Sequence, residues 1–155
     1  LAGENCAMIS EAGCPGVADP GAALAALCHR HGVRVVPLVG PSSILLALMA
    51  SGMNGQSFAF NGYLPVKTPE RQRALRNLER RARSEHQSQI FIEAPYRNRQ
   101  LLEAIVASCA ADTRVTVAVD ITAESERIVT RSVAEWRRAM PDDLHKRPAI
   151  FIIGE

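Results

Sequence analysis

Two loops rich in small residues carry the clearest chemical signal in the sequence. One spans residues 10–21 after a short apolar run at 6–9, and the other spans residues 40–43 after a second run at 33–37. Open α/β sheets bind ligands beyond the carboxyl ends of parallel strands, and small residues let a ligand approach the backbone. Backbone N–H groups and the hydroxyls of Ser42 and Ser43 suit a carboxylate or a ribose. Two ordinary tight strand-to-helix turns are the alternative.

An arginine-rich segment at 69–84 is the second chemical feature. Three of its arginines recur at three- and four-residue spacing, which places them on one face of a helix. Such a face can follow the phosphates of RNA, or it can be a solvated surface paired with the glutamates of the same segment. The residues predicted to contact RNA are Lys67, Arg73, Arg76 and Arg80, and Arg71, Arg81 and Arg83 add to the positive charge.

The first 55 residues alternate between strand and helix patterns. Strands are expected at 6–9 and 33–37, and helices from Asp19-Pro20 to Gly32 and from 43 to about 50. This alternation predicts a parallel sheet. Two strands are too few to form one that is covered on both faces, and the sequence begins with Leu1 rather than Met. We therefore expect either a partner chain or preceding βα units in a longer protein.

The remainder of the sequence predicts a mixed sheet with helices packed on it. Strands are expected at 58–60, 88–93, 115–121 and 149–153, with a short one at 127–130. Helices are expected at 69–84, at 97–110 and after Ser132, which would cap a helix carrying Trp136. The expected domains are residues 1–56, as the C-terminal part of an α/β domain, and residues 57–155, as a second α/β domain.

Composition excludes several classes of protein. The 155 residues carry a net charge of +2 and are 47% apolar, which argues against intrinsic disorder. No apolar run reaches the roughly 18 residues of a membrane span, and the N-terminus has no export signal. The four scattered cysteines predict a reduced, cytoplasmic protein. The run from Cys28 to His31 has poor ligand spacing, so no metal site is expected.

A set of motifs in a fixed order resembles a known family. The motifs are SEAGCPGVADPG at 10–21, VPLVGPSS at 36–43, FNGYLP at 60–65, FIEAPYR at 91–97, DIT at 120–122 and RPAI at 147–150. They resemble the tetrapyrrole methylase superfamily of class III S-adenosylmethionine-dependent methyltransferases. The first loop is most similar to the branch that 2′-O-methylates a cytidine ribose in 16S ribosomal RNA. The Gly-rich turn near the family's N-terminus is absent, so the chain is expected to lack the N-terminal part.

The resemblance implies a remnant of a parallel βα domain followed by a mixed-sheet α/β domain, with S-adenosylmethionine bound between them. It also implies RNA, in particular ribosomal RNA, or a small tetrapyrrole as substrate, a homodimer, and no membrane. Without the rest of the cleft, the isolated chain would be inactive or weak. The residues it implies for cofactor binding are Ala12, Gly13, Cys14, Val17, Ser42, Ser43, Glu93, Thr122, Pro148 and Ala149.

Attack by a ribose hydroxyl on the methyl group would need a proton acceptor. Glu11, Glu93 and Asp120 are the candidates, and for Glu93 an ion pair with Arg97 is the alternative. The sequence departs from the ribosomal RNA branch at several positions near the implied cleft. Two other functions therefore stay open, namely tetrapyrrole or corrin methylation and a non-catalytic homologue that binds RNA or protein. The departures include Glu11, Cys14, Tyr96, Val119 and Ala123.

Overall fold

The structure, a computed structural model, describes residues 3–11 and 13–155. The chain divides into two compact units, Leu1–Ser43 and Ile44–Glu155. Among the described residues, no helix is both long enough and apolar enough to cross a bilayer.

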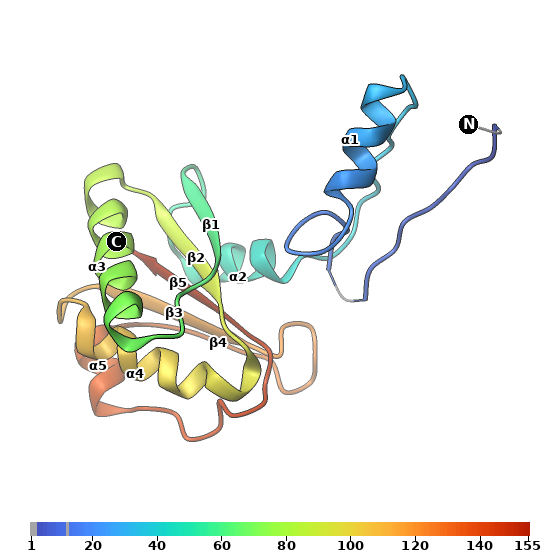
Figure 1. Ribbon diagram of the computed structural model, residues 1–155. Coiled ribbons are helices and arrows are strands. Elements are labelled where there is room, and N and C mark those ends of the chain that lie inside the picture. Colours follow the sequence, from blue (N-terminus) through green and yellow to red (C-terminus); the bar gives the residue numbers. More distant parts are fainter. Residues whose placement is uncertain (1–2, 12) are drawn as a thin grey trace. The chain divides into compact units, whose positions relative to one another are not determined.

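The second unit is built on a five-stranded mixed sheet in the order β1-β2-β5-β3-β4 (Figure 1). Strand β1 runs parallel to β2, and every other neighbouring pair is antiparallel. The predicted mixed sheet is therefore confirmed, including the short strand expected from residue 127. The strands are β1 (Phe58–Tyr63), β2 (Ser88–Ile92), β3 (Arg114–Val119), β4 (Arg127–Ser132) and β5 (Ala149–Gly154).

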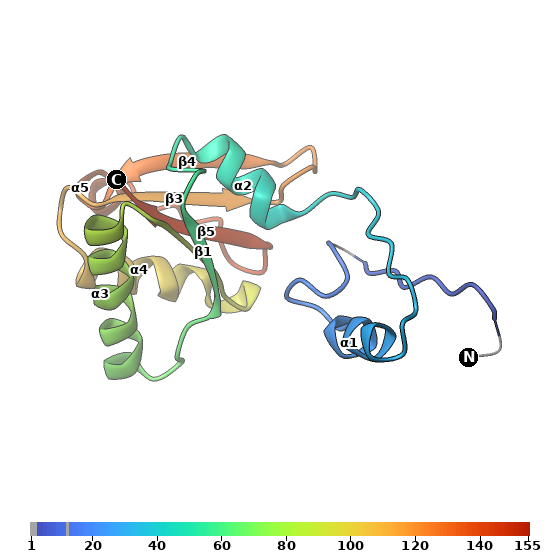
Figure 2. The same cartoon turned by 90° about the horizontal axis from the view of Figure 1, so that it is seen from above.

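Helices cover the two faces of this sheet unequally. On one face lie α3 (Thr68–Glu85), α4 (Asn98–Ser108) and α5 (Val133–Arg138), and on the other α2 (Ser43–Ser51) is the helix that packs within this unit (Figure 2). Because successive side chains of a strand point to opposite faces, Val117 and Phe151 pack beneath the three helices while Ala118 and Ile152 pack beneath α2. Because helices cover both faces, the side chains of β3 and β5 are buried on both sides, and the two strands are therefore nearly continuous apolar runs in the sequence.

A capping box begins α5, as expected from Ser132. The Ser132 hydroxyl accepts the Glu135 N–H at 3.2 Å, and the Glu135 carboxylate accepts the Ser132 N–H at 2.8 Å. Side-chain and backbone hydrogen bonds from Ser132 lower the pKa of Glu135. The folded state therefore gains from this carboxylate above the ordinary carboxyl pKa of about 4, and the gain disappears as the pH falls.

We predict that Ser132→Ala lowers the free energy of unfolding by about 1 kcal/mol at neutral pH, because a helix N-terminus loses its cap. Urea unfolding at pH 7 and at acid pH measures this effect. The difference from wild type should shrink as the pH falls below the carboxyl range. Ser84→Ala, near the exposed C-terminal end of α3, serves as the control. An equal loss in both variants would contradict the assignment.

The first unit differs from expectation in two respects. It contains α1 (Ala22–Arg30), but the described residues at 6–9 and 33–37 form no strands, so both strand predictions are wrong for this structure. A parallel strand needs neighbours that pair its backbone groups, and the described part of this unit contains no strand. The expected helix start at Asp19-Pro20 is also wrong. The Asp19 carboxylate accepts the Ser10 hydroxyl, and Gly21 occupies the N-cap position.

Helix α2 belongs largely to the second unit because Ile44, Ala47 and Leu48 pack against the sheet. The compact units consequently meet at Ser43 and Ile44, thirteen residues before the boundary expected from sequence (56 − 43 = 13). The domain division of the protein at residue 56 stays a prediction.

Candidate cofactor-binding edge and arginine stripe

The sheet topology gathers the predicted site residues of the second unit at one edge. Strands β1, β2 and β3 end there, while β4 and β5 begin there, as the pairings Ile92↔Ile150 and Val119↔Ala149 show. Glu93, Thr122 and Pro148 therefore lie on neighbouring loops, although up to 55 residues separate them in the chain (148 − 93 = 55). We call residues 63–65, 93–97, 120–127 and 147–149 the loop edge.

Glu93 is held at the loop edge by two arginines. Its Oε2 is 2.8 Å from Arg71 Nη2, and its Oε1 is 2.8 Å from Arg97 Nη2 and accepts the Ala94 N–H at 2.7 Å. The Glu93 and Arg71 side chains are only 2% and 6% exposed, and Arg71 Nε also donates to the Pro65 carbonyl at 2.8 Å. The ion pair with Arg97, considered as an alternative from sequence, is thus present and is joined by a second, buried one.

Arg71 does not belong to an RNA-facing surface. It lies on the buried face of α3 with Leu75, Leu78 and Ala82, and it connects the loop after β1 to the loop after β2. A sequence signal for this role existed, because positions 71, 75, 78 and 82 follow the helical repeat. An arginine on an otherwise apolar face must find a buried partner.

The loop between β3 and β4 has an unusual backbone. Asp120 and Thr122 adopt φ values of 49° and 73°, which a β-branched residue such as Thr rarely does. Glu126 accepts the Thr122 N–H at 2.6 Å, and the Asp120 carbonyl accepts the Ala123 N–H at 2.9 Å. Residues held in such conformations cluster at functional sites, which supports the assignment of Thr122 to the site.

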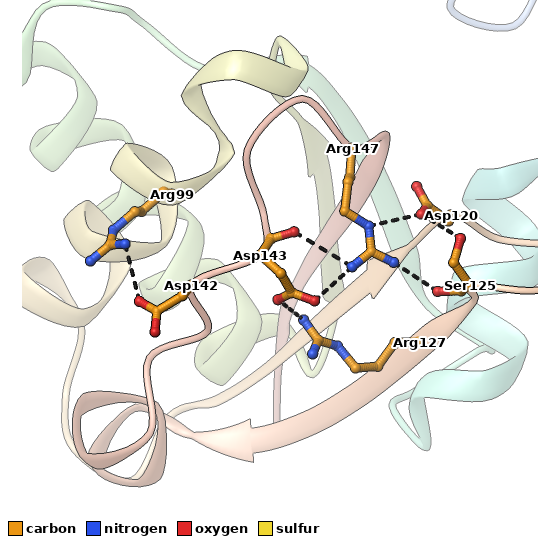
Figure 3. A network of polar contacts seen from close by, with 7 residues as sticks. All are labelled: Arg99, Asp120, Ser125, Arg127, Asp142, Asp143 and Arg147. Carbon is orange, nitrogen blue, oxygen red and sulfur yellow. Dashed lines mark hydrogen bonds and ion pairs between the residues drawn. The ribbon is translucent and has the colours of Figure 1, made fainter.

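A network of charged side chains surrounds this loop (Figure 3). Arg147 donates to Asp120 Oδ2, to the Ser125 carbonyl and to Asp143 Oδ2 at 2.7–2.8 Å, and Arg127 donates to Asp143 Oδ1 at 2.6 Å. The Ser125 hydroxyl and then Arg147 lower the pKa of Asp120, and Arg127 lowers that of Asp143. Sequence reasoning missed Arg127, Asp143 and Ser125, because pairing across loops leaves no local pattern.

In the first unit the two small-residue loops meet. Cys14 Sγ lies 3.5 Å from the Pro41 carbonyl oxygen, and the Cys14 carbonyl accepts the Val17 N–H at 3.1 Å. Gly13 has a φ of 106°, and a Cβ there would meet nothing within 4 Å, so its backbone is open to a ligand. Ser42 is half-buried. Of the other predicted residues, Glu11 and Ser43 are exposed, and Ala12 lies outside the described residues.

The three arginines predicted to share a face of α3 differ from the other arginines of this helix, which form ion pairs with carboxylates. Arg73, Arg76 and Arg80 are exposed and form no ion pair within the described residues. Two of the three glutamates of α3 are engaged elsewhere, Glu85 with Arg81 and Glu79 with Arg83 and the Ala110 N–H, while Glu70 forms no ion pair within the described residues. We call Lys67, Arg73, Arg76 and Arg80 the arginine stripe.

The arginine stripe leads away from the loop edge. Helix α3 starts after β1 and ends before β2 begins, so its C-terminal end lies at the opposite edge of the sheet. A hollow of about 490 Å³ opens there, lined by Arg76, Glu79, Arg80, Arg83, Ser84 and Ala110. At 1.5 Å per residue, Lys67 and Arg80 are about 20 Å apart along the helix. A ligand that contacts both ends must therefore be long.

Cys109 is predicted to be inert in the folded protein, because burial raises the pKa of its thiol to about 12 and the thiolate is the reactive form. Native alkylation with iodoacetamide at pH 8, followed by peptide mass spectrometry, should leave Cys109 unmodified while Cys6 reacts. Cys6 is exposed and supplies the internal control. Equal labelling of the two residues would contradict the prediction.

A mixed sheet whose loops gather at one edge, in a chain that also carries two small-residue loops, defines an α/β protein. A family model described as Tetrapyrrole (Corrin/Porphyrin) Methylases matches residues 1–136, and the chain belongs to this family. The resemblance seen in the sequence is thereby confirmed.

Curated relatives carry the name Ribosomal RNA small subunit methyltransferase I. Those from Escherichia coli O157:H7 and Pasteurella multocida are 34% and 36% identical over 151 residues, which is 97% of this chain. The alignments cover 51% and 52% of the two relatives, so the chain spans about half their length.

Solved structures share the fold. The methyltransferase CobJ is 19% identical with a TM-score of 0.60, over 92% of this chain and 62% of that one. The uroporphyrin-III C-methyl transferase from Thermus thermophilus, complexed with S-adenyl homocysteine, is 19% identical with a TM-score of 0.53, over 92% and 63%. At this identity the likeness establishes the fold class, which agrees with the mixed α/β architecture expected from sequence.

Proposed function

We propose that this chain is part of a methyltransferase that transfers a methyl group from S-adenosylmethionine to a ribose hydroxyl of ribosomal RNA. One observation carries the proposal. Within each unit, cofactor residues that the family resemblance implies and that are scattered along the sequence lie close together. In the second unit Glu93, Thr122 and Pro148 lie on the loop edge, and in the first unit Cys14 contacts the loop that contains Ser42. The names of the curated relatives support the same activity.

The residues present fit such a cofactor by their chemistry. An adenosine needs backbone groups and nearby polar side chains, and the loop edge offers the backbone of residues 120–123 and of Pro148. A methionine moiety needs close access to backbone groups, which the open backbone of Gly13 offers. Bound S-adenosylmethionine would supply the electrophilic methyl group. The chain's own residues would hold the cofactor and align the substrate, which can account for much of the rate.

The three carboxylates proposed as proton acceptors differ in their surroundings. Glu93 is occupied by two arginines, and Asp120 by Arg147 and Ser125, whose hydrogen bonds lower its pKa. A carboxylate with a lowered pKa is a weaker base. Glu11 is exposed, and we propose it as the acceptor ahead of Glu93 and Asp120.

RNA is the substrate that the arginine stripe favours. Its arginines, which form no ion pair within the described residues, suit a chain of phosphates. The curated relatives named for ribosomal RNA are 34% and 36% identical to the chain, whereas the solved methyltransferases named for uroporphyrin and precorrin substrates are 19–20% identical. We also propose a cytoplasmic homodimer. Leu45 and Met49 on α2 are 48% and 78% exposed, and analytical ultracentrifugation at increasing concentration tests the association.

Protection of a single thiol tests the cofactor site. S-adenosylhomocysteine at saturating concentration should slow alkylation of Cys14 while the labelling of Cys6 stays unchanged. The test is run on this chain and on the chain extended at its N-terminus to the length of its curated relatives, with calorimetric titration in parallel. We expect binding and methyl transfer by the extended protein and weak or no transfer by this chain alone.

The other outcomes are equally informative. Binding by neither protein would favour a non-catalytic homologue and overturn the proposed activity. Full methyl transfer by the 155-residue chain would show that the rest of the relatives' length is dispensable.

A further inference from the structure

We propose that Arg147 is a positioning residue that holds the 120–126 loop in the shape required to receive the adenosine end of the cofactor. The proposal rests on the proposed function for the identity of the ligand. Its structural part, that Arg147 sets the conformation of the loop, stands on contacts within the second unit alone.

Arg147 contacts acceptors on three residues through one guanidinium group, two of them in the 120–126 loop and the third being Asp143. Nε donates to Asp120 Oδ2 at 2.8 Å, Nη2 to the Ser125 carbonyl at 2.7 Å, and Nη1 to Asp143 Oδ2 at 2.7 Å (Figure 3). The first two contacts connect Asp120, at the start of the loop, with Ser125, near its end. A planar guanidinium can satisfy such a set of acceptors at once, whereas an ammonium group cannot.

Hydrogen bonds outside the loop fix the position of Arg147. The buried Asn98, at the start of α4, donates through Nδ2 to the Arg147 carbonyl at 2.6 Å. Asp143 is held by Arg127, the first residue of β4, at 2.6 Å. The Arg147 side chain is 22% exposed and that of Asp120 15%, so solvent screens the ion pair between these two residues less than it screens a surface pair.

The loop needs such support because its backbone is unfavourable. Thr122 at a φ of 73° and Asp120 at 49° are conformations that persist only when surrounding contacts impose them. Without Arg147, these residues would relax to ordinary backbone angles. The Pro148 carbonyl, which accepts the Asp120 N–H at 3.0 Å, would then lose its alignment with the loop. The ligand would bind only to the fraction of molecules with the correct loop, and its apparent affinity would fall by that fraction.

The test compares Arg147→Ala with Arg99→Ala. Arg99 contacts Asp142, next to Asp143, at 3.2 Å and has no contact with the loop, so it is a matched control (Figure 3). Amide hydrogen exchange is followed by NMR at Asp120, Thr122 and Ala123, whose N–H groups are bonded within or beside the loop. We expect exchange at these amides to rise about tenfold or more in Arg147→Ala, with amides of the β3–β5 pairing unchanged, and no rise in Arg99→Ala.

Two further variants guard against misfolding. Asp143→Asn weakens the hold on Arg147 without removing it and should give a smaller rise at the same amides. Arg147→Lys, which keeps the charge but reaches fewer acceptors, should fall between wild type and Arg147→Ala. Unchanged exchange in Arg147→Ala, or an equal rise in Arg99→Ala, overturns the proposal.

Cofactor affinity is the second measurement. Titration of S-adenosylhomocysteine into the N-terminally extended protein should show a dissociation constant about tenfold higher for Arg147→Ala. A loosened loop with unchanged affinity overturns the positioning role. A wild-type protein that binds no S-adenosylhomocysteine refutes the proposed function instead, and the exchange result then decides by itself whether Arg147 sets the loop.

Discussion

Replacing Glu93 with alanine is expected to lower the free energy of unfolding by about 3–5 kcal/mol, because it leaves the buried Arg71 guanidinium without its partner. Arg71 is 6% exposed on its side chain and cannot reach water to recover the lost interaction. The same change removes the acceptor for Arg97 and for the Ala94 N–H. Urea unfolding of the chain, followed by circular dichroism, measures the loss.

Glu103→Ala is the matched control. Glu103 accepts from Arg99 at 3.1 Å, but both side chains are about half exposed, and surface ion pairs contribute little to stability. A double variant, Arg71→Met with Glu93→Leu, should recover most of the stability, since apolar residues can replace a buried ion pair at little cost. A loss from Glu93→Ala below about 1 kcal/mol would mean that Arg71 finds another partner and that the buried ion pair is not what joins the two loops.

The second large effect is expected on RNA binding. Changing Arg73, Arg76 and Arg80 to glutamine removes three cations that form no ion pair within the described residues. Each lost phosphate contact lowers the slope of log affinity against log salt by about 0.7–0.9. The triple variant should therefore lose a slope of about 2–3, and on the order of a hundredfold in affinity at about 0.1 M salt. Fluorescence anisotropy with a labelled ribosomal RNA fragment, from low to high salt, measures both quantities.

A second triple variant controls for net charge. Changing Arg81, Arg99 and Arg138 to glutamine removes the same charge from other surfaces, and Arg81 and Arg99 already have carboxylate partners. Its slope should stay close to that of wild type. Equal losses in the two triple variants would indicate attraction by overall charge, and the arginine stripe would then have no special role.

The sequence by itself determined the elements of the second unit and the family. Period-two and period-3.6 patterns are local, so β2, β3, β5 and α3 could be predicted within a few residues, as could the capping box at Ser132. The motifs from 10–21 to 147–150, taken together in their order, were sufficient to recognise the family, because each is a short local run of residue types.

Only the tertiary structure decided which charges meet. Arg71 and Glu93 are 22 residues apart, and Asp120 and Arg147 are 27 apart, so no local repeat connects them. The structure also showed which arginines of α3 form ion pairs. Arg71, Arg81 and Arg83 do so, whereas Arg73, Arg76 and Arg80 form none within the described residues. In the first unit, apolar patterns at 6–9 and 33–37 predicted strands that the described residues do not form. A pattern records a preference for burial, whereas a strand also needs neighbouring strands to pair its backbone.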